Sequence, residues 1–259
     1  MPIITLTSDW GLRDHYLAAV KGTILSRLPD ARIVDITHQV EPFNLKQASF
    51  ILRNSYRHFP EGTIHIISLR TEETKDFPHV VMVYDGHYFI GTDNGIFSLI
   101  FNKIPEKMFE LTIPQDSDYF TFSTRDRFVK AAVHLAEGKP VEELGRPRTE
   151  WQQQMHFQPV VSGDVIRGIV IYVDNYENVI TNITRELFDE IGKGRKFSIE
   201  CRGEQLKTIS TSYLDVPAGD IVALFGSTGH LEIAINQGNA SGLLGLYVND
   251  SLRVEFQSS

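Results

Sequence analysis

The chain has 259 residues, 42% of them hydrophobic and 22% charged, and a formal net charge of −8 at pH 7. A chain of this length buries about three quarters of its unfolded surface, enough for one large domain or two modest ones. The negative charge argues against nucleic acid as the main partner, because such binders need clustered Lys and Arg. The longest apolar runs fall far short of the roughly 18 residues that span a bilayer, so no membrane partner is expected.

The only cysteine, Cys201, excludes an internal disulfide and a cysteine-rich metal site. The first residues carry no basic region and reach a carboxylate at Asp9, unlike a signal peptide. These features together predict a protein of the reducing cytoplasm.

The first half of the chain alternates short apolar runs with runs of helical spacing. Strands are predicted at 3–6, 33–36 and 63–69, and helices at 16–28 and 45–56. Such alternation indicates βαβ units around a mostly parallel sheet flanked by helices.

Two further elements follow before the character of the sequence changes. An Asp-Gly pair at 85–86 separates two apolar runs and predicts a two-residue β-hairpin. A long amphipathic helix is expected at 126–136, closed by a glycine and a proline.

A polar segment then divides the chain. We predict an α/β domain at 1–147, a linker at 148–163 that contains three successive glutamines, and a second domain at 164–259. In the second domain short apolar runs alternate with turn residues, and only 185–191 looks helical. The apolar runs are 165–173, 196–201, 221–225, 230–235 and 251–256. This pattern is typical of a small antiparallel β-barrel.

Several common catalytic motifs are absent. The chain has no phosphate-binding P-loop, no Gly-x-Gly-x-x-Gly after a strand and no Gly-x-Ser-x-Gly elbow. The nine histidines show no His-Glu-x-x-His spacing, and Asp35 and His38 are interpreted as a capped turn rather than metal ligands. We therefore expect no metal ion.

Asp9 lies where the first strand should end, at the carboxyl edge at which open α/β sheets bind ligands. A carboxylate there can accept two hydrogen bonds from a ribose diol. A turn-capping role fits the spacing equally well, so both interpretations stay open.

Two polar clusters mark the second half. Asp174, Tyr176 and Asn178 follow a wholly apolar strand and offer a carboxylate, an aromatic face and an amide, a combination that suits a purine. Ser227 lies between glycines, where main-chain N–H groups can approach a carboxylate. Both clusters are also ordinary turn sequences, and periodicity does not decide between a turn and a ligand site.

A family resemblance rests on short segments between about residues 2 and 256, which follow one another in the same order as in the family. They include Thr7-Ser-Asp-Trp-Gly-Leu-Arg-Asp, Val34-Asp-Ile-Thr-His, Phe59-Pro-Glu-Gly-Thr, Asp93-Asn-Gly, Arg125-Asp, Leu144-Gly-Arg, Asp174-Asn-Tyr-Glu-Asn and Leu231-Glu-Ile-Ala-Ile-Asn. Together they resemble the S-adenosylmethionine hydroxide adenosyltransferase family, whose relatives include the fluorinase and the chlorinase.

The resemblance implies an N-terminal α/β domain and a C-terminal small β-barrel, assembled as a homotrimer with sites between subunits. It also implies S-adenosylmethionine or adenosine as the small-molecule substrate or ligand, with no further cofactor. By position, Asp9 would hold the ribose hydroxyls, and Phe43, Phe122 and Tyr176 would flank the ligand. The remaining ligand contacts would come from Asn178 and the main chain near Gln237 at the adenine, and from Asp174 and Ser227 at the amino-acid end of methionine.

Hydrolytic members of that family hold the attacking water with an Asp, an Arg and a His. An ungapped comparison places Arg70, Phe77 and Ser123 at those positions, so none of the three is retained. A cationic Arg70 would oppose a sulfonium ligand. Ser123 and Thr124 would instead position the water.

The leading hypothesis is therefore the displacement of methionine by water, which gives adenosine and L-methionine. The alternatives are a catalytically silent protein that binds S-adenosylmethionine or adenosine, and adenosyl transfer to a halide or another nucleophile.

Overall fold

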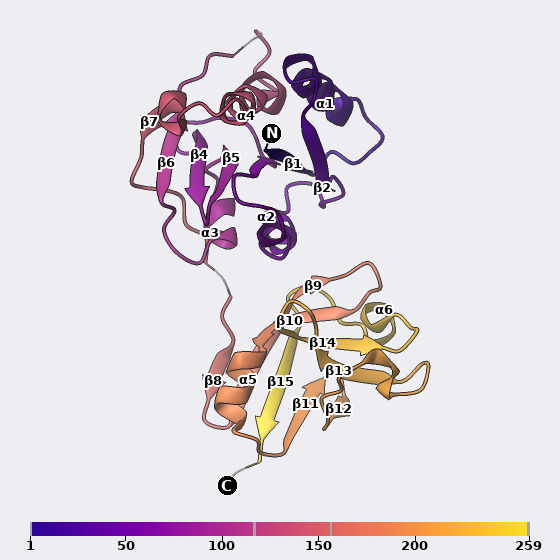
Figure 1. Ribbon diagram of the computed structural model, residues 1–259. Coiled ribbons are helices and arrows are strands. Elements are labelled where there is room, and N and C mark those ends of the chain that lie inside the picture. The colour runs from indigo at the N-terminus through magenta and orange to yellow at the C-terminus, as the bar shows by residue number, and fades with distance from the viewer. Residues whose placement is uncertain (1, 116–117, 156, 258–259) are drawn as a thin grey trace. The chain divides into compact units, whose positions relative to one another are not determined.

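The computed structural model describes residues 2–115, 118–155 and 157–257. The chain divides into two compact units, Met1–Met155 and His156–Ser259, and each is described by itself (Figure 1). None of the helices in the described ranges combines the length and the apolar character that a membrane crossing requires.

The first unit is an α/β domain that contains a seven-stranded sheet. Its strands are β1 (Ile3–Ser8), β2 (Arg32–Thr37), β3 (Ile64–Ser68), β4 (His79–Tyr84), β5 (His87–Thr92), β6 (Lys107–Leu111) and β7 (Gly145–Pro147). Its helices are α1 (Tyr16–Arg27), α2 (Leu45–Arg53), α3 (Ile96–Ile100) and α4 (Val129–Ala136), with short helical turns η1 (Tyr56–His58), η2 (Thr124–Phe128) and η3 (Val141–Leu144).

The sheet is mixed, so the expectation of a mostly parallel sheet holds for part of it. The strand order is β2-β1-β3-β5-β4-β6-β7; the first four strands run parallel, and β4, β6 and β7 pair antiparallel with their neighbours. The predicted hairpin explains the reversal. Asp85 and Gly86 have φ values of 54° and 75°, as a tight hairpin turn requires, and such a turn can join only antiparallel strands.

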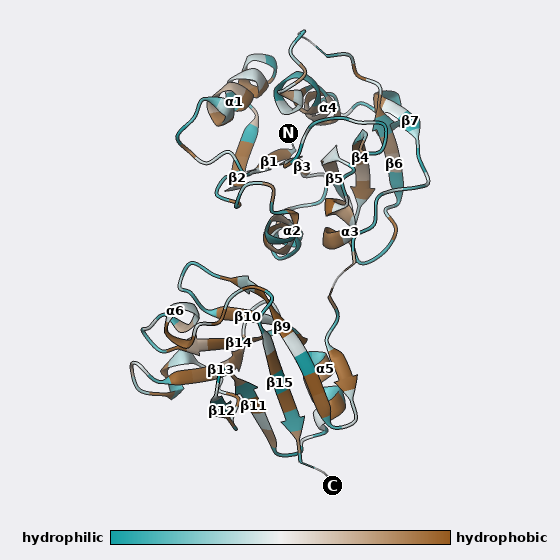
Figure 2. Cartoon of the chain, turned by 180° about the vertical axis from the view of Figure 1, so that it is seen from behind, coloured by the Kyte–Doolittle hydropathy of each residue, from teal (hydrophilic) through white to brown (hydrophobic). Residues whose placement is uncertain are grey.

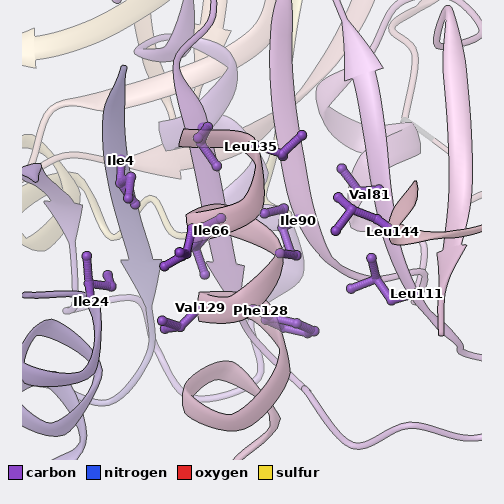
Figure 3. Close-up of a cluster of buried hydrophobic side chains, with 14 of the residues drawn as sticks. Ile4, Ile24, Ile66, Val81, Ile90, Leu111, Phe128, Val129, Leu135 and Leu144 are labelled. Carbon is purple, nitrogen blue, oxygen red and sulfur yellow. The ribbon is translucent and has the colours of Figure 1, made fainter. Parts of the chain in front are cut away.

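Helices cover both faces of this sheet and bury two apolar clusters. Residues of α1 and α4 pack on one face, where Val129 and Leu135 of α4 lie over Ile66 and Ile90 of the sheet (Figure 3). Residues of α2 and α3 pack on the other face. Full burial of one such aliphatic side chain contributes about 1.5–3 kcal/mol, so these two layers fix the sheet and its carboxyl edge.

The second unit is built from an antiparallel, barrel-like sheet. Its elements are β8 (Val160–Ser162), β9 (Val165–Val173), β10 (Val179–Thr184), α5 (Arg185–Gly192), β11 (Phe197–Cys201), β12 (Glu204–Leu206), η4 (Tyr213–Asp215), β13 (Ile221–Phe225), β14 (His230–Ile235), α6 (Ala240–Leu244) and β15 (Ser251–Phe256). Leu252, Val254 and Phe256 of β15 are buried while their neighbours are exposed or partly so, which is the period-two pattern of a half-buried strand. In both units hydrophobic residues concentrate on the strands, and the connecting loops are mostly hydrophilic (Figure 2).

Candidate functional site

A cavity of about 1180 Å³ opens at the carboxyl edge of the sheet in the first unit. β1 leads through α1 to β2 on one side, whereas the crossover through α2 places β3 on the other side of β1. The carboxyl ends of β1 and β3 therefore flank a topological switch point, where open α/β sheets bind ligands. Asp9, directly after β1, and Ser68, the last residue of β3, both line the cavity.

The Asp9 carboxylate is held in place at the cavity wall. Its Oδ2 accepts a 2.9 Å hydrogen bond from the backbone N–H of Phe43, a residue with a left-handed φ of 66°. Below it, Ser8 Oγ lies 2.7 Å from Nδ1 of the buried His38 and so supports the end of β1. A non-glycine residue at positive φ costs energy and is kept where the surrounding structure demands it. No hydrogen bond joins Asp9 Oδ1 to another described residue.

Aromatic side chains form a wall of the same cavity. Phe122 packs edge-to-face against Trp10 and Tyr16, with ring centroids 5.6 and 5.3 Å apart. All three rings line the cavity, and so does Phe43, which is 62% exposed. Rings fixed in this way can pack against a sugar or a planar base.

Ser123 and Thr124 lie where the chain enters α4. The π-helical turn η2 begins at Thr124, and turns of this kind are frequent at functional sites. The Thr124 hydroxyl is fully buried and donates a 3.0 Å hydrogen bond to Ser68 Oγ. Ser123 and Ser68 line the cavity, whereas Thr124 is not among the described residues that do. Thr124 therefore reaches the cavity through Ser68, a residue that the sequence did not single out.

The cavity also contains an ion-pair network that the sequence analysis missed. Arg127 donates through Nη1 to Glu73 Oε2 at 2.5 Å and to His79 Nδ1 at 3.0 Å. It donates through Nη2 and Nε to the backbone carbonyls of Leu111 and Ile113 at 3.0 and 2.9 Å. The Arg127 side chain is 11% exposed and that of Glu73 is 39% exposed. Arg127, Glu73 and His79 all line the cavity.

His79 in this network is the neutral imidazole. Because a guanidinium can only donate, Nδ1 of His79 must accept from Arg127. Its Nε2 then carries the proton and donates to the Thr71 carbonyl at 2.8 Å. Burial lowers the pKa of His79, which agrees with the neutral form. Both ring nitrogens are occupied, so His79 orients its neighbours.

Arg70 follows β3 and lines the cavity as an exposed cation. It adopts a left-handed φ of 48°, and the Asn94 side chain donates a 3.0 Å hydrogen bond to the adjacent Leu69 carbonyl. Glu73, which could have offset Arg70, pairs with Arg127 instead. The charged lining comprises the carboxylates of Asp9, Glu72 and Glu73 and two guanidiniums, which leaves one net negative charge. That balance suits a cationic ligand.

The segment 151–154 belongs to the first unit and lines part of the cavity. Trp151 stacks on Phe101 with ring centroids 6.0 Å apart. The backbone N–H of Gln152 donates to both carboxylate oxygens of Asp93, at 3.0 and 3.1 Å. Burial raises the pKa of Asp93. Gln152 and Gln154 line the cavity, so part of the segment expected as a linker contributes to the site of the first unit.

In the second unit, Asp174 organises the turn after β9. Its Oδ1 accepts 2.9 Å hydrogen bonds from the backbone N–H groups of Tyr176 and Asn178, and its Oδ2 accepts from Asn178 Nδ2 at 3.1 Å. Glu177 within the turn has a φ of 60°. The Tyr176 ring is 77% exposed, whereas Asn178 is buried. The turn therefore presents an aromatic face outward above a fixed carboxylate and amide.

The other two predicted residues of this unit lie at opposite ends of β14. Ser227 is exposed in the β13–β14 turn, whereas Gln237 follows β14 with a φ of 56°. Six strand residues separate the two ends by about 17–20 Å. Val179 pairs with Ile233, and Ser241 N donates to the Glu177 carbonyl at 2.9 Å. The structure thus brings the 174–178 turn next to Gln237, whereas Ser227 lies in the turn that precedes β14.

A buried carboxyl group lies on β14 between those ends. Glu232 is 5% exposed, and its Oε1 accepts a 2.6 Å hydrogen bond from the Tyr213 hydroxyl. Burial and the charge of Asp174 raise the pKa of both Glu232 and Tyr213, burial being the larger cause. Within the described residues, no group of three or more His, Cys, Asp or Glu side chains could hold a metal ion.

A switch-point cavity with a fixed carboxylate and an aromatic wall, in a chain that continues into an antiparallel β-unit, defines a two-domain protein with a candidate small-molecule site. Comparison with known families gives the particular group. Residues 4–145 match the SAM hydroxide adenosyltransferase N-terminal domain, and residues 168–253 match the SAM hydroxide adenosyltransferase C-terminal domain. The chain belongs to this family, and the resemblance read from its sequence is confirmed.

Similar proteins extend over almost the whole chain. An (R)-S-adenosyl-L-methionine hydrolase of Thermus thermophilus is 31% identical over 92% of this chain and 94% of its own length. A fluorinase of Nocardia brasiliensis is 26% identical over 98% of this chain and 97% of its own length. A crystal structure of an uncharacterized conserved protein from Thermotoga maritima has a TM-score of 0.89 at 30% identity, and covers 97% of this chain and 99% of its own.

Proposed function

We propose that this protein hydrolyses S-adenosylmethionine to adenosine and L-methionine. The observation that carries the proposal is the cavity at the switch point, where a fixed Asp9 and an aromatic wall meet in a cavity of net negative charge. Curated relatives named (R)-S-adenosyl-L-methionine hydrolase, from Thermus thermophilus and Methanocaldococcus jannaschii, support the choice of substrate.

Each part of the proposal has a physical reason. Asp9 Oδ1 accepts a hydrogen bond from a ribose hydroxyl, while Phe122 and its edge-to-face partners pack against the ligand. A sulfonium is a good leaving group, so the protein has mainly to position water behind the ribose 5′ carbon and exclude bulk solvent. Ser123 and Ser68 supply hydroxyls at the cavity wall for that purpose.

A catalytically silent protein that binds S-adenosylmethionine or adenosine is the second candidate. Arg70 favours it, because this cation stands in the cavity at the position that our ungapped comparison assigns to the Asp of hydrolytic members. Adenosyl transfer to a halide is a lesser alternative, supported by the fluorinase among the relatives.

One experiment separates these functions. The purified protein is incubated with S-adenosylmethionine, adenosine and methionine are followed by chromatography, and binding of S-adenosylmethionine and of adenosine is measured by calorimetry. We expect stoichiometric release of both products. Tight binding without products would support the silent protein, and a halide-dependent new nucleoside would support transfer.

Variants tie the result to the cavity. Asp9→Ala should abolish turnover, because the ribose loses its fixed acceptor. Asp14→Ala is the matched control, since that carboxylate is exposed beside Arg13 and does not line the cavity. No binding of either ligand by the parent protein would discard both candidate functions. The homotrimer and the cytoplasmic location stay predictions, and sedimentation tests the former.

A further inference from the structure

We propose that Glu73 is the carboxylate that accepts the proton of the attacking water, and that Arg127, which is itself bound to His79, holds it in position. The inference rests on the proposed hydrolysis and names the proton acceptor that the sequence did not supply. All three side chains line the cavity at the edge of the sheet that also carries Asp9.

The location of the network follows from strand direction. β4 runs antiparallel to β5, so His79, its first residue, lies at the carboxyl edge of the parallel strands. β6 runs antiparallel to β4 and ends at that same edge with Leu111. Arg127 reaches this edge from η2, one turn after Ser123. The Arg127–Glu73 ion pair therefore lies at the same carboxyl edge of the sheet as Asp9 and Ser68.

Arg127 is fixed more firmly than a surface cation. Its four hydrogen bonds go to Glu73, His79 and two backbone carbonyls that follow β6. A guanidinium bound on several sides presents one fixed geometry to its carboxylate partner. The carboxylate of Glu73 is thereby oriented before any ligand enters.

Glu73 still has capacity to accept a proton. Its Oε2 receives Arg127, whereas Oε1 is 3.8 Å from His79 Nδ1 and has only a long 3.5 Å contact with the His79 backbone N–H. Its side chain is 39% exposed and lines the cavity, so water reaches it. His79 cannot take the role, because both of its ring nitrogens are occupied. Glu72 lines the cavity but makes no hydrogen bond or ion pair with a described residue, so nothing orients it.

The water oxygen bonds to the ribose 5′ carbon while the carbon–sulfur bond breaks, and the electron pair of that bond stays on the methionine sulfur. The proton of the water passes to Glu73 Oε1 and leaves later to solvent. S-adenosylmethionine and water thus become adenosine, methionine and one proton.

Glu73→Gln tests the inference because the amide oxygen still accepts from Arg127 but cannot take a proton. We expect kcat to fall about 100-fold or more, the range of a lost general base, with the calorimetric Kd for S-adenosylmethionine changed by less than about threefold. Glu73→Ala with sodium formate should recover activity in proportion to formate, since the small carboxylate can occupy the vacated space. Glu142→Gln is the matched control; it breaks the exposed 2.6 Å ion pair with Lys107, outside the cavity, and should leave kcat unchanged.

Each other outcome contradicts a defined part of the proposal. An active parent protein with an equally active Glu73→Gln variant overturns the role of Glu73 and leaves the proposed hydrolysis intact. Loss of kcat together with a lowered Tm, with no effect of formate on Glu73→Ala, shows that the network only supports the fold. A parent protein that binds S-adenosylmethionine without turnover overturns the hydrolysis and this inference with it.

Discussion

The cavity of the first unit and the 174–178 turn of the second hold their polar side chains in opposite ways. Arg127 joins Glu73 and His79 across 54 and 48 positions of sequence, and Thr124 reaches Ser68 across 56. The Asp174 carboxylate instead accepts from groups two and four residues away. In the first unit, contacts between distant segments position the polar side chains. In the second unit, a local turn positions the polar side chains and exposes the ring of Tyr176.

This difference predicts that a single substitution lowers the free energy of unfolding by different amounts in the two units. A network that joins several segments leaves buried partners unsatisfied when one member is lost. A turn can often satisfy its backbone N–H groups with water instead. Both tryptophans, Trp10 and Trp151, lie in the first unit, so tryptophan fluorescence reports on that unit alone.

The largest expected effect comes from Arg127→Met. The variant leaves Glu73 without its cation and two backbone carbonyls without their donor, so the first unit should lose about 3 kcal/mol of unfolding free energy. Urea unfolding followed by tryptophan fluorescence measures the loss. Lys107→Met breaks the exposed pair with Glu142 and should leave the unfolding free energy nearly unchanged, because water screens an exposed ion pair. Equal losses would show that the network is no more than a surface ion pair.

A pH-dependent loss of stability, about 2 kcal/mol by pH 5, is expected from His65 on β3. Burial, reinforced by His87, lowers the pKa of His65 from 6.5 to about 3, and Thr5 Oγ1 and His87 Nδ1 lie 2.7 and 3.2 Å from its ring nitrogens. Below pH 6.5 the unfolded chain binds a proton that the folded unit does not, so stability falls as the pH drops towards 3. His65→Gln should be less stable at pH 7 but should show a slope shallower by up to about 1.4 kcal/mol per pH unit. Urea unfolding at pH 7, 6 and 5 gives both slopes, and identical slopes would contradict the assignment.

The elements of the fold were predictable where local pattern decides them. The strand and the polar turn that place Asp9 were expected from the first apolar run, and the Asp-Gly hairpin formed as predicted. The helix expected at 45–56 ends at Arg53, because the Asn54 side chain donates to the Phe50 carbonyl and closes it. β10 (VITNIT) was missed because turn residues precede it and an asparagine interrupts its apolar run.

The Arg127 network could not be predicted from pattern, because periodicity carries no information about residues about fifty positions apart. The antiparallel β4–β5 pair was expected from the Asp-Gly turn, but the antiparallel pairing of β6 and β7 was missed because it depends on long-range packing. One signal was present in the sequence. Glu73 lies between two apolar strands and Arg127 lies at the start of the helix predicted at 126–136, and the two carry opposite charges, but nothing local pairs them.

A smaller effect is expected from Asp174→Ala in the second unit. The variant removes three hydrogen bonds from a solvent-facing turn and should cost about 1 kcal/mol, because water replaces the acceptor for the Tyr176 and Asn178 N–H groups. Asp174→Asn keeps the Oδ1 acceptor and should lose less. Thermal unfolding followed by circular dichroism detects both changes. A loss of unfolding free energy as large as that of Arg127→Met would contradict the proposed difference between the two units.

The smallest expected effect, and the one that bears most directly on the ligand, comes from Arg70→Ala. Arg70 is exposed and has no ion-pair partner among the described residues. Water and salt therefore screen the effect of its charge on a ligand in the cavity. Removing it should tighten the binding of S-adenosylmethionine about two- to threefold at low salt, and the gain should vanish as salt is raised. Binding of neutral adenosine, measured alongside by calorimetry, should not change. Weaker binding of S-adenosylmethionine would mean instead that Arg70 holds the carboxylate of the ligand.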